Sequence, residues 1–199
     1  MKLRYLFHKK LFDLIAPFYQ LFFHSQLRTY RKYLKLYKHK LGLSPGAKIL
    51  DLGCGTGAFG LAFQELGFEV IGIDSSHRML QKANNNYLSV INVDLLTPYF
   101  PFESNSFDLV IGANVIHGFQ LKEREIIYQE AARLTKKYVL FHDYSNKRNI
   151  FVSIIEWIEH GDYFNFIRQV PEDFYKIFKN VVILPNSESY SAWYLCSIS

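Results

Sequence analysis

The sequence has little cysteine and no long apolar run. Its 199 residues include two cysteines, Cys54 and Cys196, which match neither a disulfide framework nor the C-x-x-C spacing of a zinc site. Such a count is typical of a reducing compartment, so we expect a cytoplasmic protein. No segment reaches the roughly 20 apolar residues of a membrane-spanning helix, and no cluster of side chains has the spacing of a metal site. We therefore expect neither a membrane span nor a bound metal.

Positive charge is unevenly distributed along the chain. Residues 1–42 hold ten Lys/Arg and one acid, a net charge of +9, whereas the remaining residues carry a net charge of −4. A protein that binds nucleic acid normally carries its basic residues on the face that contacts it, so this split argues against a nucleic-acid partner. The basic N-terminal segment could instead contact an anionic membrane, or pack on its own body and form a lid over the cofactor site. Packing and lid formation are the favoured interpretation. The sequence does not predict an oligomeric state.

The N-terminal segment is predicted to contain two helices. The first spans about residues 3–16 and ends near Pro17, because proline disfavours the helical conformation of the residue before it. The second ends at Gly42 and carries an apolar stripe at steps of three and four residues, which places its members on one helix face: Leu27, Tyr30, Leu34, Tyr37 and Leu41. The chain therefore divides into a basic helical arm, residues 1–46, and a body, residues 47–199.

In the body, short apolar runs alternate with helical patterns, which is typical of repeated βα units around a parallel sheet. Strands are predicted at residues 48–52, 69–73, 88–93, 108–113, 138–142, 181–184 and 192–196, and helices at 58–66, 76–84, 122–135, 149–160 and 171–179. The link between the last two strands is too short for a parallel crossover, so they form an antiparallel hairpin. The expected fold class is α/β: a Rossmann-like three-layer sandwich with a mainly parallel seven-stranded sheet, its last strand antiparallel, preceded by the helical arm.

A glycine-rich turn follows the first strand of the body. Residues 51–57, DLGCGTG, run from a buried strand into a helix. Glycines are needed where the backbone turns sharply and a ligand approaches it closely, and the N–H groups at the helix start favour an electron-rich ligand group. Asp74 follows Gly53 by 21 positions, about the spacing at which an acid accepts hydrogen bonds from a ribose diol.

The same turn invites a rival interpretation. Residues 55–60, GTGAFG, satisfy the G-x-G-x-x-G fingerprint of dinucleotide sites. Asp51 argues against a dinucleotide, because a carboxylate beside the turn repels a pyrophosphate and attracts an ammonium group. S-adenosylmethionine (SAM) has no phosphate and carries both an ammonium and a sulfonium. An NAD-dependent oxidoreductase is therefore the less favoured interpretation.

The turn resembles motif I, D-x-G-x-G-x-G, of the class I SAM-dependent methyltransferases. Residues 70–74 (VIGID), 90–95 (VINVDL) and 105–111 (NSFDLVI) are similar to the three motifs that follow it in that family, and the likeness covers roughly residues 47–199. The resemblance implies SAM as the cofactor, an acid on the ribose, an acid on the adenine amino group and a segment at residues 113–117 that lines the methionine end. The implied cofactor-binding residues are Asp51, Gly53, Cys54, Gly55, Gly57, Asp74, Ser75, Met79, Asp94, Leu95 and Asn114.

The expected activity is methyl transfer to a small-molecule acceptor, and the alternative is a non-catalytic SAM-binding module whose arm recruits a partner. A hydroxyl, amine or acidic carbon acceptor would benefit from a base. Ligands of open parallel sheets lie beyond the carboxyl ends of the strands, so the candidates are His117 and His142, the latter in a His142-Asp143-Tyr144 cluster. Histidine titrates near neutral pH, which suits a general base. Either histidine could instead be structural.

Three tyrosines are candidates for the lid or the substrate pocket. Residues 12–19, FDLIAPFY, resemble the FDxIAPxYD opening of many such enzymes, including ubiquinone/menaquinone C-methyltransferases, in which the tyrosine lies in a lid over the cofactor. This implies a lid role for Tyr19, although Gln20 stands where an acid is usual. Tyr144, and Tyr163 in the aromatic stretch 161–167, are expected to line the substrate pocket. That stretch could equally be a connection that covers the sheet.

Overall fold

A computed structural model describes residues 2–84, 89–147, 162–185 and 190–198 of the protein. These residues contain seven strands and the helices that connect them. For residues 2–20 and for Pro185 only the backbone is described. The chain forms two compact units, Met1–Thr97 and Pro98–Ser199. The predicted division of the chain after residue 46 stays a prediction.

The first unit contains three parallel strands in the order β3-β2-β1. They are β1 (Lys48–Leu52), β2 (Glu69–Asp74) and β3 (Ser89–Asn92), connected through α2 (Ala58–Gln64) and α3 (His77–Ala83). Ile49, Leu50 and Leu52 of β1 have no exposed surface, as expected for a parallel strand that is covered on both faces. Gly72 is required in β2, because a Cβ there would lie 2.8 Å from the Sγ atom of Cys54.

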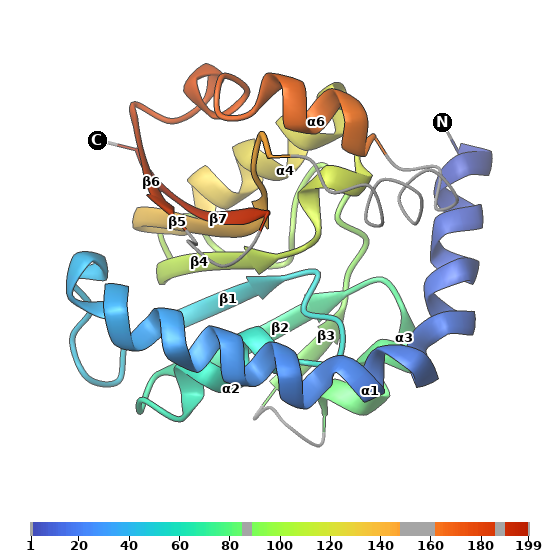
Figure 1. Ribbon diagram of the computed structural model, residues 1–199, viewed down its shortest axis with the longest axis horizontal. Coiled ribbons are helices and arrows are strands. Elements are labelled where there is room, and N and C mark those ends of the chain that lie inside the picture. Colours follow the sequence, from blue (N-terminus) through green and yellow to red (C-terminus); the bar gives the residue numbers. More distant parts are fainter. Residues whose placement is uncertain (1, 85–88, 148–161, 186–189, 199) are drawn as a thin grey trace. The chain divides into compact units, whose positions relative to one another are not determined.

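The arm is one helix, α1 (Lys2–Leu41), so the predicted break near Pro17 is wrong. Proline removes one backbone hydrogen bond and crowds the preceding turn, which bends a helix more often than it ends one inside a long helical segment. Figure 1 shows that α1 changes direction in its N-terminal half, the half that contains Pro17.

The second half of α1 packs on α2 and α3 through the predicted apolar stripe. Leu27, Tyr30, Leu34 and Leu41 are buried and Tyr37 is half-buried, so the stripe is confirmed. Two further buried side chains, Phe23 and Tyr33, belong to the same face. Contacts with α2 and the residue that follows it include the rings of Tyr30 and Phe59, 4.7 Å apart, and two hydrogen bonds from Arg31 to Glu65, of 2.7 and 2.5 Å.

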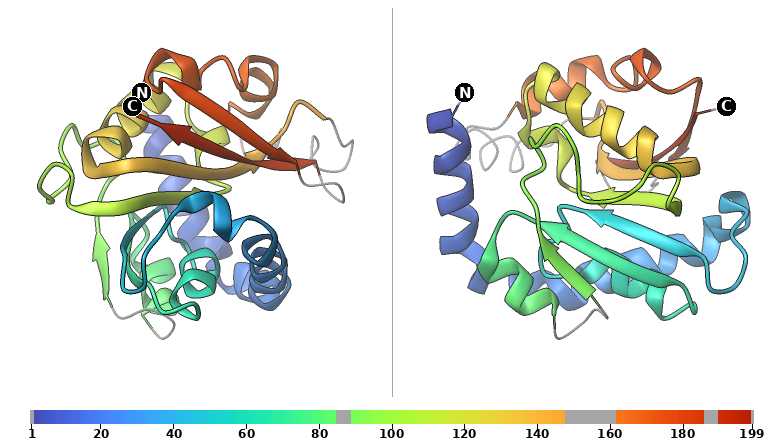
Figure 2. Two further views of the ribbon diagram at one scale, coloured as in Figure 1. Left: turned by 90° about the vertical axis from the view of Figure 1, so that its left-hand side faces the viewer. Right: turned by 180° about the vertical axis from the view of Figure 1, so that it is seen from behind.

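The second unit has four strands in the order β4-β5-β7-β6. β4 (Phe107–Ala113) and β5 (Thr135–Tyr144) are parallel, whereas β7 (Ser191–Ser197) is antiparallel to both β5 and β6 (Asn180–Pro185). Figure 2 shows the β6–β7 pair, which confirms the predicted hairpin. Between the strands lie η1 (Ile116–Gly118), α4 (Leu121–Leu134), α6 (Tyr163–Gln169) and η2 (Phe174–Lys176), with α4 packed on β4 and β5.

Two secondary-structure predictions in this unit are wrong. The aromatic stretch expected as a connection forms α6, because Tyr163, Phe166 and Ile167 lie three and four positions apart and bury one helix face. The helix predicted over residues 171–179 is a turn followed by η2, with bonds between residues three apart, such as Ile177 N–H to Phe174 O, and a single bond of α-helical type, from Phe178 N–H to the same carbonyl. The helix predicted at residues 149–160 lies outside the described residues.

The predicted fold class is confirmed: an α/β protein with seven strands, mainly parallel, of which the last is antiparallel. No helix of the described part is long and apolar enough to cross a membrane. Both cysteines are buried, Cys54 in the first unit and Cys196 in the second. Burial raises the pKa of the Cys196 thiol well above its ordinary value.

Candidate active site

In the first unit, the glycine-rich turn connects β1 to α2 through backbone conformations that favour glycine. Gly53, Gly55 and Gly57 have φ angles of 61°, 54° and 92°, which side-chain-bearing residues adopt at a cost. Cys54 N–H donates to the Ile73 carbonyl in β2 at 3.0 Å. A Cβ built on Gly55 would meet nothing within 4 Å, so the space beside its Cα atom is unfilled.

Asp74, at the end of β2, ties this turn to the neighbouring strand ends. Its Oδ2 accepts the N–H of Gly55 at 2.9 Å and its Oδ1 accepts the N–H of Ser76 at 2.8 Å. Its backbone carbonyl accepts the N–H of Val93 at 3.0 Å and the side-chain amide of Asn92 at 2.9 Å. The structure therefore brings together the glycine turn, the predicted ribose-binding acid and the end of β3.

The other candidate cofactor residues of this unit differ in exposure. Asp51 is buried, and its Oδ2 accepts the N–H of Gly60 at 3.1 Å. Met79 and Leu95 are buried, whereas Ser75 is half-buried. Asp94 is exposed and accepts the N–H of Leu96 at 2.8 Å. Asp51 thus supports the first turn of α2 as well as being a candidate ligand-binding residue.

The electrostatics of the turn fit a cationic ligand. Burial, and then the negative charges of Asp74 and Asp51, raise the pKa of the Cys54 thiol well above its ordinary value. The thiol belongs to the turn, so both carboxylates make the field at the turn negative. A negative field of this kind repels a pyrophosphate and attracts an ammonium or a sulfonium.

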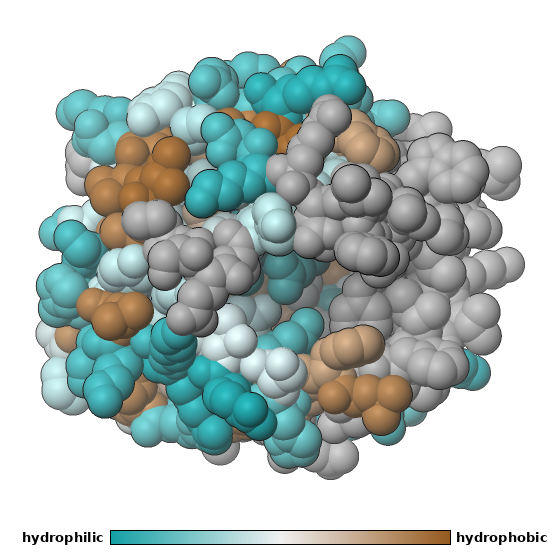
Figure 3. All heavy atoms as spheres, viewed as in Figure 1, coloured by the Kyte–Doolittle hydropathy of each residue, from teal (hydrophilic) through white to brown (hydrophobic). Residues whose placement is uncertain are grey.

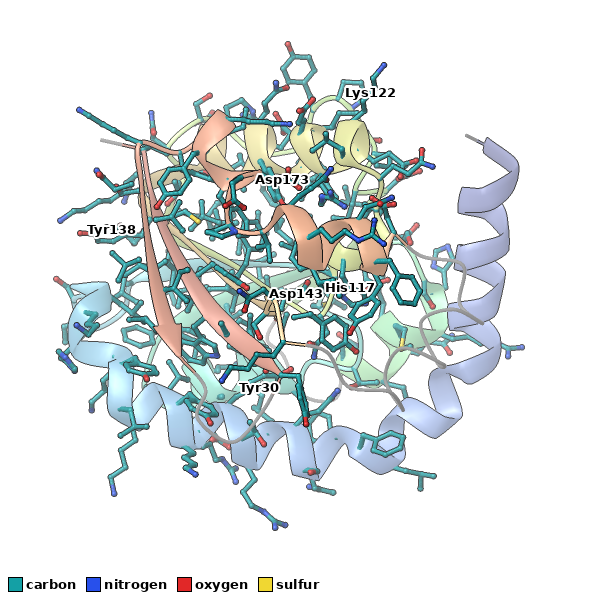
Figure 4. The ribbon with its side chains drawn as sticks, turned by 45° about the horizontal axis from the view of Figure 1, so that its top comes forward. Tyr30, His117, Lys122, Tyr138, Asp143 and Asp173 are labelled. Atoms are coloured by element: carbon teal, nitrogen blue, oxygen red, sulfur yellow. The ribbon has the colours of Figure 1, made fainter. Side chains whose placement is uncertain are left out.

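In the second unit, a buried carboxylate at the end of β5 organises the segment after β4. The Asp143 Oδ2 atom accepts the N–H groups of Val115, Ile116 and His117 at 3.2, 3.0 and 3.4 Å, which are the first N–H groups around η1. The Oδ1 atom lies 2.7 Å from the Nδ1 atom of His117, and Figure 4 shows the two side chains beside each other. Asp143 therefore fixes both the backbone and the imidazole of His117.

Asp143 is ionised, and His117 is buried except for a small part of its ring. Burial alone would raise the pKa of Asp143, but the attraction and hydrogen bond of His117, with the N–H of Tyr144, lower it below its ordinary value. The Asp143 side chain is 1% exposed and that of His117 is 10% exposed. With Nδ1–H donated to the carboxylate, the basic nitrogen of the imidazole is Nε2. This is the arrangement of an oriented general base.

Aromatic rings continue from His117 toward α6. The Tyr144 ring contacts the His117 ring edge-on, with centroids 4.7 Å apart, and the Tyr163 ring contacts Tyr144 at 4.9 Å. Tyr163 is fully buried, and its hydroxyl has no hydrogen-bond partner among the described residues. The structure thus brings together His117, Tyr144 and Tyr163.

His142 has different surroundings. Successive side chains of a strand point to opposite faces, so His142 and Asp143 lie on opposite faces of β5. His142 pairs with Trp193 of β7, with ring centroids 6.3 Å apart. Burial lowers the pKa of His142 to about 4, despite the attraction of Asp143. Its imidazole is therefore neutral near pH 7 and weakly basic.

A buried arginine that the sequence did not single out joins η1, α4 and α6. Arg124 has no exposed surface. It donates to Asp173 at 2.8 and 3.1 Å, to Asp162 at 2.9 Å and to the carbonyl of Phe119 at 2.6 Å. Phe119 directly follows η1 and Asp162 directly precedes α6, so one guanidinium connects the segments that carry His117 and Tyr163.

Two remaining candidates are less well defined. Asn114 has a φ of 53° and donates its N–H to the His142 carbonyl at 2.8 Å, so it forms the sharp turn between β4 and η1. Tyr19 lies on α1, but its side chain is outside the described residues.

The described residues contain no group of three His, Cys, Asp or Glu side chains arranged to hold a metal ion.

The comparisons with known proteins agree with this geometry. Residues 49–138, which include the glycine turn, Asp74 and the Asp108–Val110 strand, match the family model of a methyltransferase domain. The fold is that of a SAM-dependent methyltransferase from Thermotoga maritima, described as a possible histamine N-methyltransferase, with a TM-score of 0.70 and 16% identity over 96% of this chain and 99% of that one. Residues 49–138 therefore resemble a methyltransferase domain, and the chain shares the fold of a SAM-dependent methyltransferase.

The curated methyltransferases that the chain matches are longer. An uncharacterized methyltransferase of Synechocystis sp. is 32% identical over 101 residues, 51% of this chain and 48% of the relative. A demethylmenaquinone methyltransferase of Tropheryma whipplei is 40% identical over 73 residues, 36% of this chain and 30% of the relative. The chain thus spans about half the length, or less, of these two methyltransferases.

Proposed function

We propose that this chain transfers a methyl group from SAM to a small-molecule acceptor, with His117 as the general base and Asp143 as the residue that orients it. The observation that carries the proposal is the 2.7 Å contact between His117 Nδ1 and a buried, ionised Asp143. The second oxygen of that carboxylate holds the backbone of the same segment, so the imidazole is fixed before the acceptor binds.

The first unit would hold the cofactor. Asp74, already oriented by the N–H groups of Gly55 and Ser76, is proposed to accept hydrogen bonds from the ribose. The negative field of Asp51 and Asp74 favours the cationic end of the ligand. When bound, SAM supplies a methyl group on a sulfonium, which is already a reactive electrophile.

The chain's own contribution is orientation and proton removal. Holding the acceptor in line can lower a barrier by about 7–11 kcal/mol, and a positioned base adds roughly 10²–10⁴-fold. His117 Nε2 would take the proton of the acceptor atom, and the charge of Asp143 would stabilise the imidazolium that results. His117 is favoured over His142 because the pKa of His142, about 4, makes it a poor base at neutral pH.

A small molecule is favoured as the acceptor because the ring of Tyr144 packs on His117 and the buried ring of Tyr163 packs on Tyr144, which gives the base an aromatic environment. The T. whipplei relative is named for a small-molecule acceptor, and the T. maritima structure is named for a possible one. The negative charge of residues 43–199 is also unfavourable for a nucleic-acid acceptor.

The test uses methyl-labelled SAM with two acceptor pools, a metabolite extract and total tRNA. Label is expected in the metabolite pool, and the rate should fall at acidic pH as His117 becomes protonated. His117→Gln should lower turnover about 10²-fold or more with SAM affinity unchanged, whereas His142→Gln, the matched control, should retain most turnover. Transfer of label to tRNA alone would overturn the small-molecule acceptor. Full turnover in His117→Gln would overturn the base, and SAM binding without any transfer would indicate a non-catalytic module.

A further inference from the structure

The outward face of α1 carries positive charge and no acid of its own, and one of its cations, Arg31, pairs with Glu65, the residue that follows α2. Residues 21–41 hold six Lys/Arg and no Asp/Glu. All six are exposed, and they are Arg28, Arg31, Lys32, Lys35, Lys38 and Lys40. Because the opposite face of the helix packs on α2 and α3, the charge is gathered on one side of the helix.

Large apolar side chains lie on the same exposed surface. Leu21 is 76% exposed, Phe22 is 61% exposed and Leu36 is 51% exposed. Figure 3 shows apolar side chains over α1 at its lower right. A single exposed leucine is ordinary, but an adjacent Leu-Phe pair at one end of a six-cation face is the composition of a helix that lies in a membrane interface.

We propose that this face of α1, from Leu21 to Lys40, docks on an anionic membrane surface. Lys and Arg near a negatively charged bilayer are attracted by a field that salt screens, while their aliphatic stems and the Leu21–Phe22 pair enter the interface. A nucleic acid would account for the cations but would leave the apolar pair in water. The proposal goes beyond the proposed reaction and does not depend on His117.

The contact can be measured by flotation of the intact protein with vesicles. Vesicles of phosphatidylcholine with about 30 mol% phosphatidylglycerol are compared with phosphatidylcholine alone. Binding is expected on the anionic vesicles only, falling at least tenfold as NaCl rises from about 50 to about 300 mM. Arg28→Glu/Lys35→Glu/Lys38→Glu should lower the partition coefficient at least tenfold. The matched control, Lys122→Glu/Lys147→Glu/Lys179→Glu, makes the same change in net charge at exposed positions of the second unit and should bind as the wild type does.

A second variant separates a membrane from other polyanions. Leu21→Ser/Phe22→Ser keeps the charge and should weaken vesicle binding about tenfold, while binding to heparin or duplex DNA stays unchanged. Equal loss of binding in both charge-reversal variants would overturn the assignment to α1. Unchanged vesicle binding in the serine variant, or binding to duplex DNA in preference to vesicles, would overturn the membrane as the partner. Because all the substituted side chains are exposed, circular dichroism and thermal melts should match the wild type.

Discussion

Replacement of Arg124 by methionine should destabilise the second unit strongly. The guanidinium has no exposed surface and neutralises Asp173, whose side chain is 3% exposed. Removing one partner of a buried ion pair leaves an uncompensated charge and costs about 3–5 kcal/mol. Two features of the site place the expected loss of folding free energy at the lower end of that range. Lys176 Nζ lies 4.0 Å from the other oxygen of Asp173, and Asp162, the second carboxylate on Arg124, retains 14% exposure and can hydrate.

The assays are urea-induced and thermal unfolding, both followed by circular dichroism. A loss of about 3 kcal/mol corresponds to a fall in Tm of roughly 6–12 °C for a chain of this size. The double variant Arg124→Met/Asp173→Asn should recover at least half of the stability lost in Arg124→Met, because the unpaired negative charge of Asp173 is then removed as well. Arg31→Met, which breaks an exposed pair with Glu65, is the control and should change little. A loss in Arg124→Met no larger than in Arg31→Met would refute the view that buried charge holds α6 and η2 on α4.

Two further predictions concern the cofactor and acid stability. Asp74→Ala should weaken SAM binding at least tenfold by calorimetry, because hydrogen bonds to a charged group are worth about 1.5–3 kcal/mol each. Asp74→Asn keeps one hydrogen-bond acceptor, so its SAM affinity should fall less. Unchanged SAM affinity in both variants would exclude the ribose role of Asp74. His142, with a pKa of about 4 in the folded protein against 6.5 for an unperturbed histidine, takes up its proton more readily when the chain unfolds. The free energy of unfolding should therefore fall by roughly 3 kcal/mol as the pH drops from 6.5 to about 4. Urea titrations at several pH values should show a smaller fall in the His142→Gln variant. Identical pH profiles in the variant and the wild type would contradict a buried, neutral His142.

Much of the fold could be predicted because its signals are local. The strand predictions agree with the structure to within a few residues, since parallel strands are continuous apolar runs bounded by turns. The glycine turn and Asp74 could be predicted for the same reason: strand, turn and helix follow one another in the chain. The helical spacing of Tyr163, Phe166 and Ile167 was also present in the sequence, but the richness in aromatic residues was interpreted as a pocket-lining connection.

The partnerships of the candidate site could not be predicted, because they join distant positions. Asp143 and His117 are 26 residues apart, and Arg124 lies 49 residues from Asp173. Only the pairing of β4 with β5, which sets Ala113 opposite His142, places Asp143 beside the segment after β4. The buried position of Arg124 had a weak signal, because it lies three and four residues before the buried Ile127 and Tyr128. A buried arginine requires acidic side chains to balance its charge, and the sequence alone does not identify which acids these are.

Because both cysteines are buried, their alkylation can be used to measure how often each part of the molecule unfolds locally. Each compact unit contains one thiol, Cys54 in the first and Cys196 in the second. Both thiols are protonated and enclosed in the native state, so alkylating reagents react only when the surrounding unit opens. The two alkylation rates, followed by mass spectrometry of the two peptides, therefore distinguish a chain whose units unfold together from one whose units open separately.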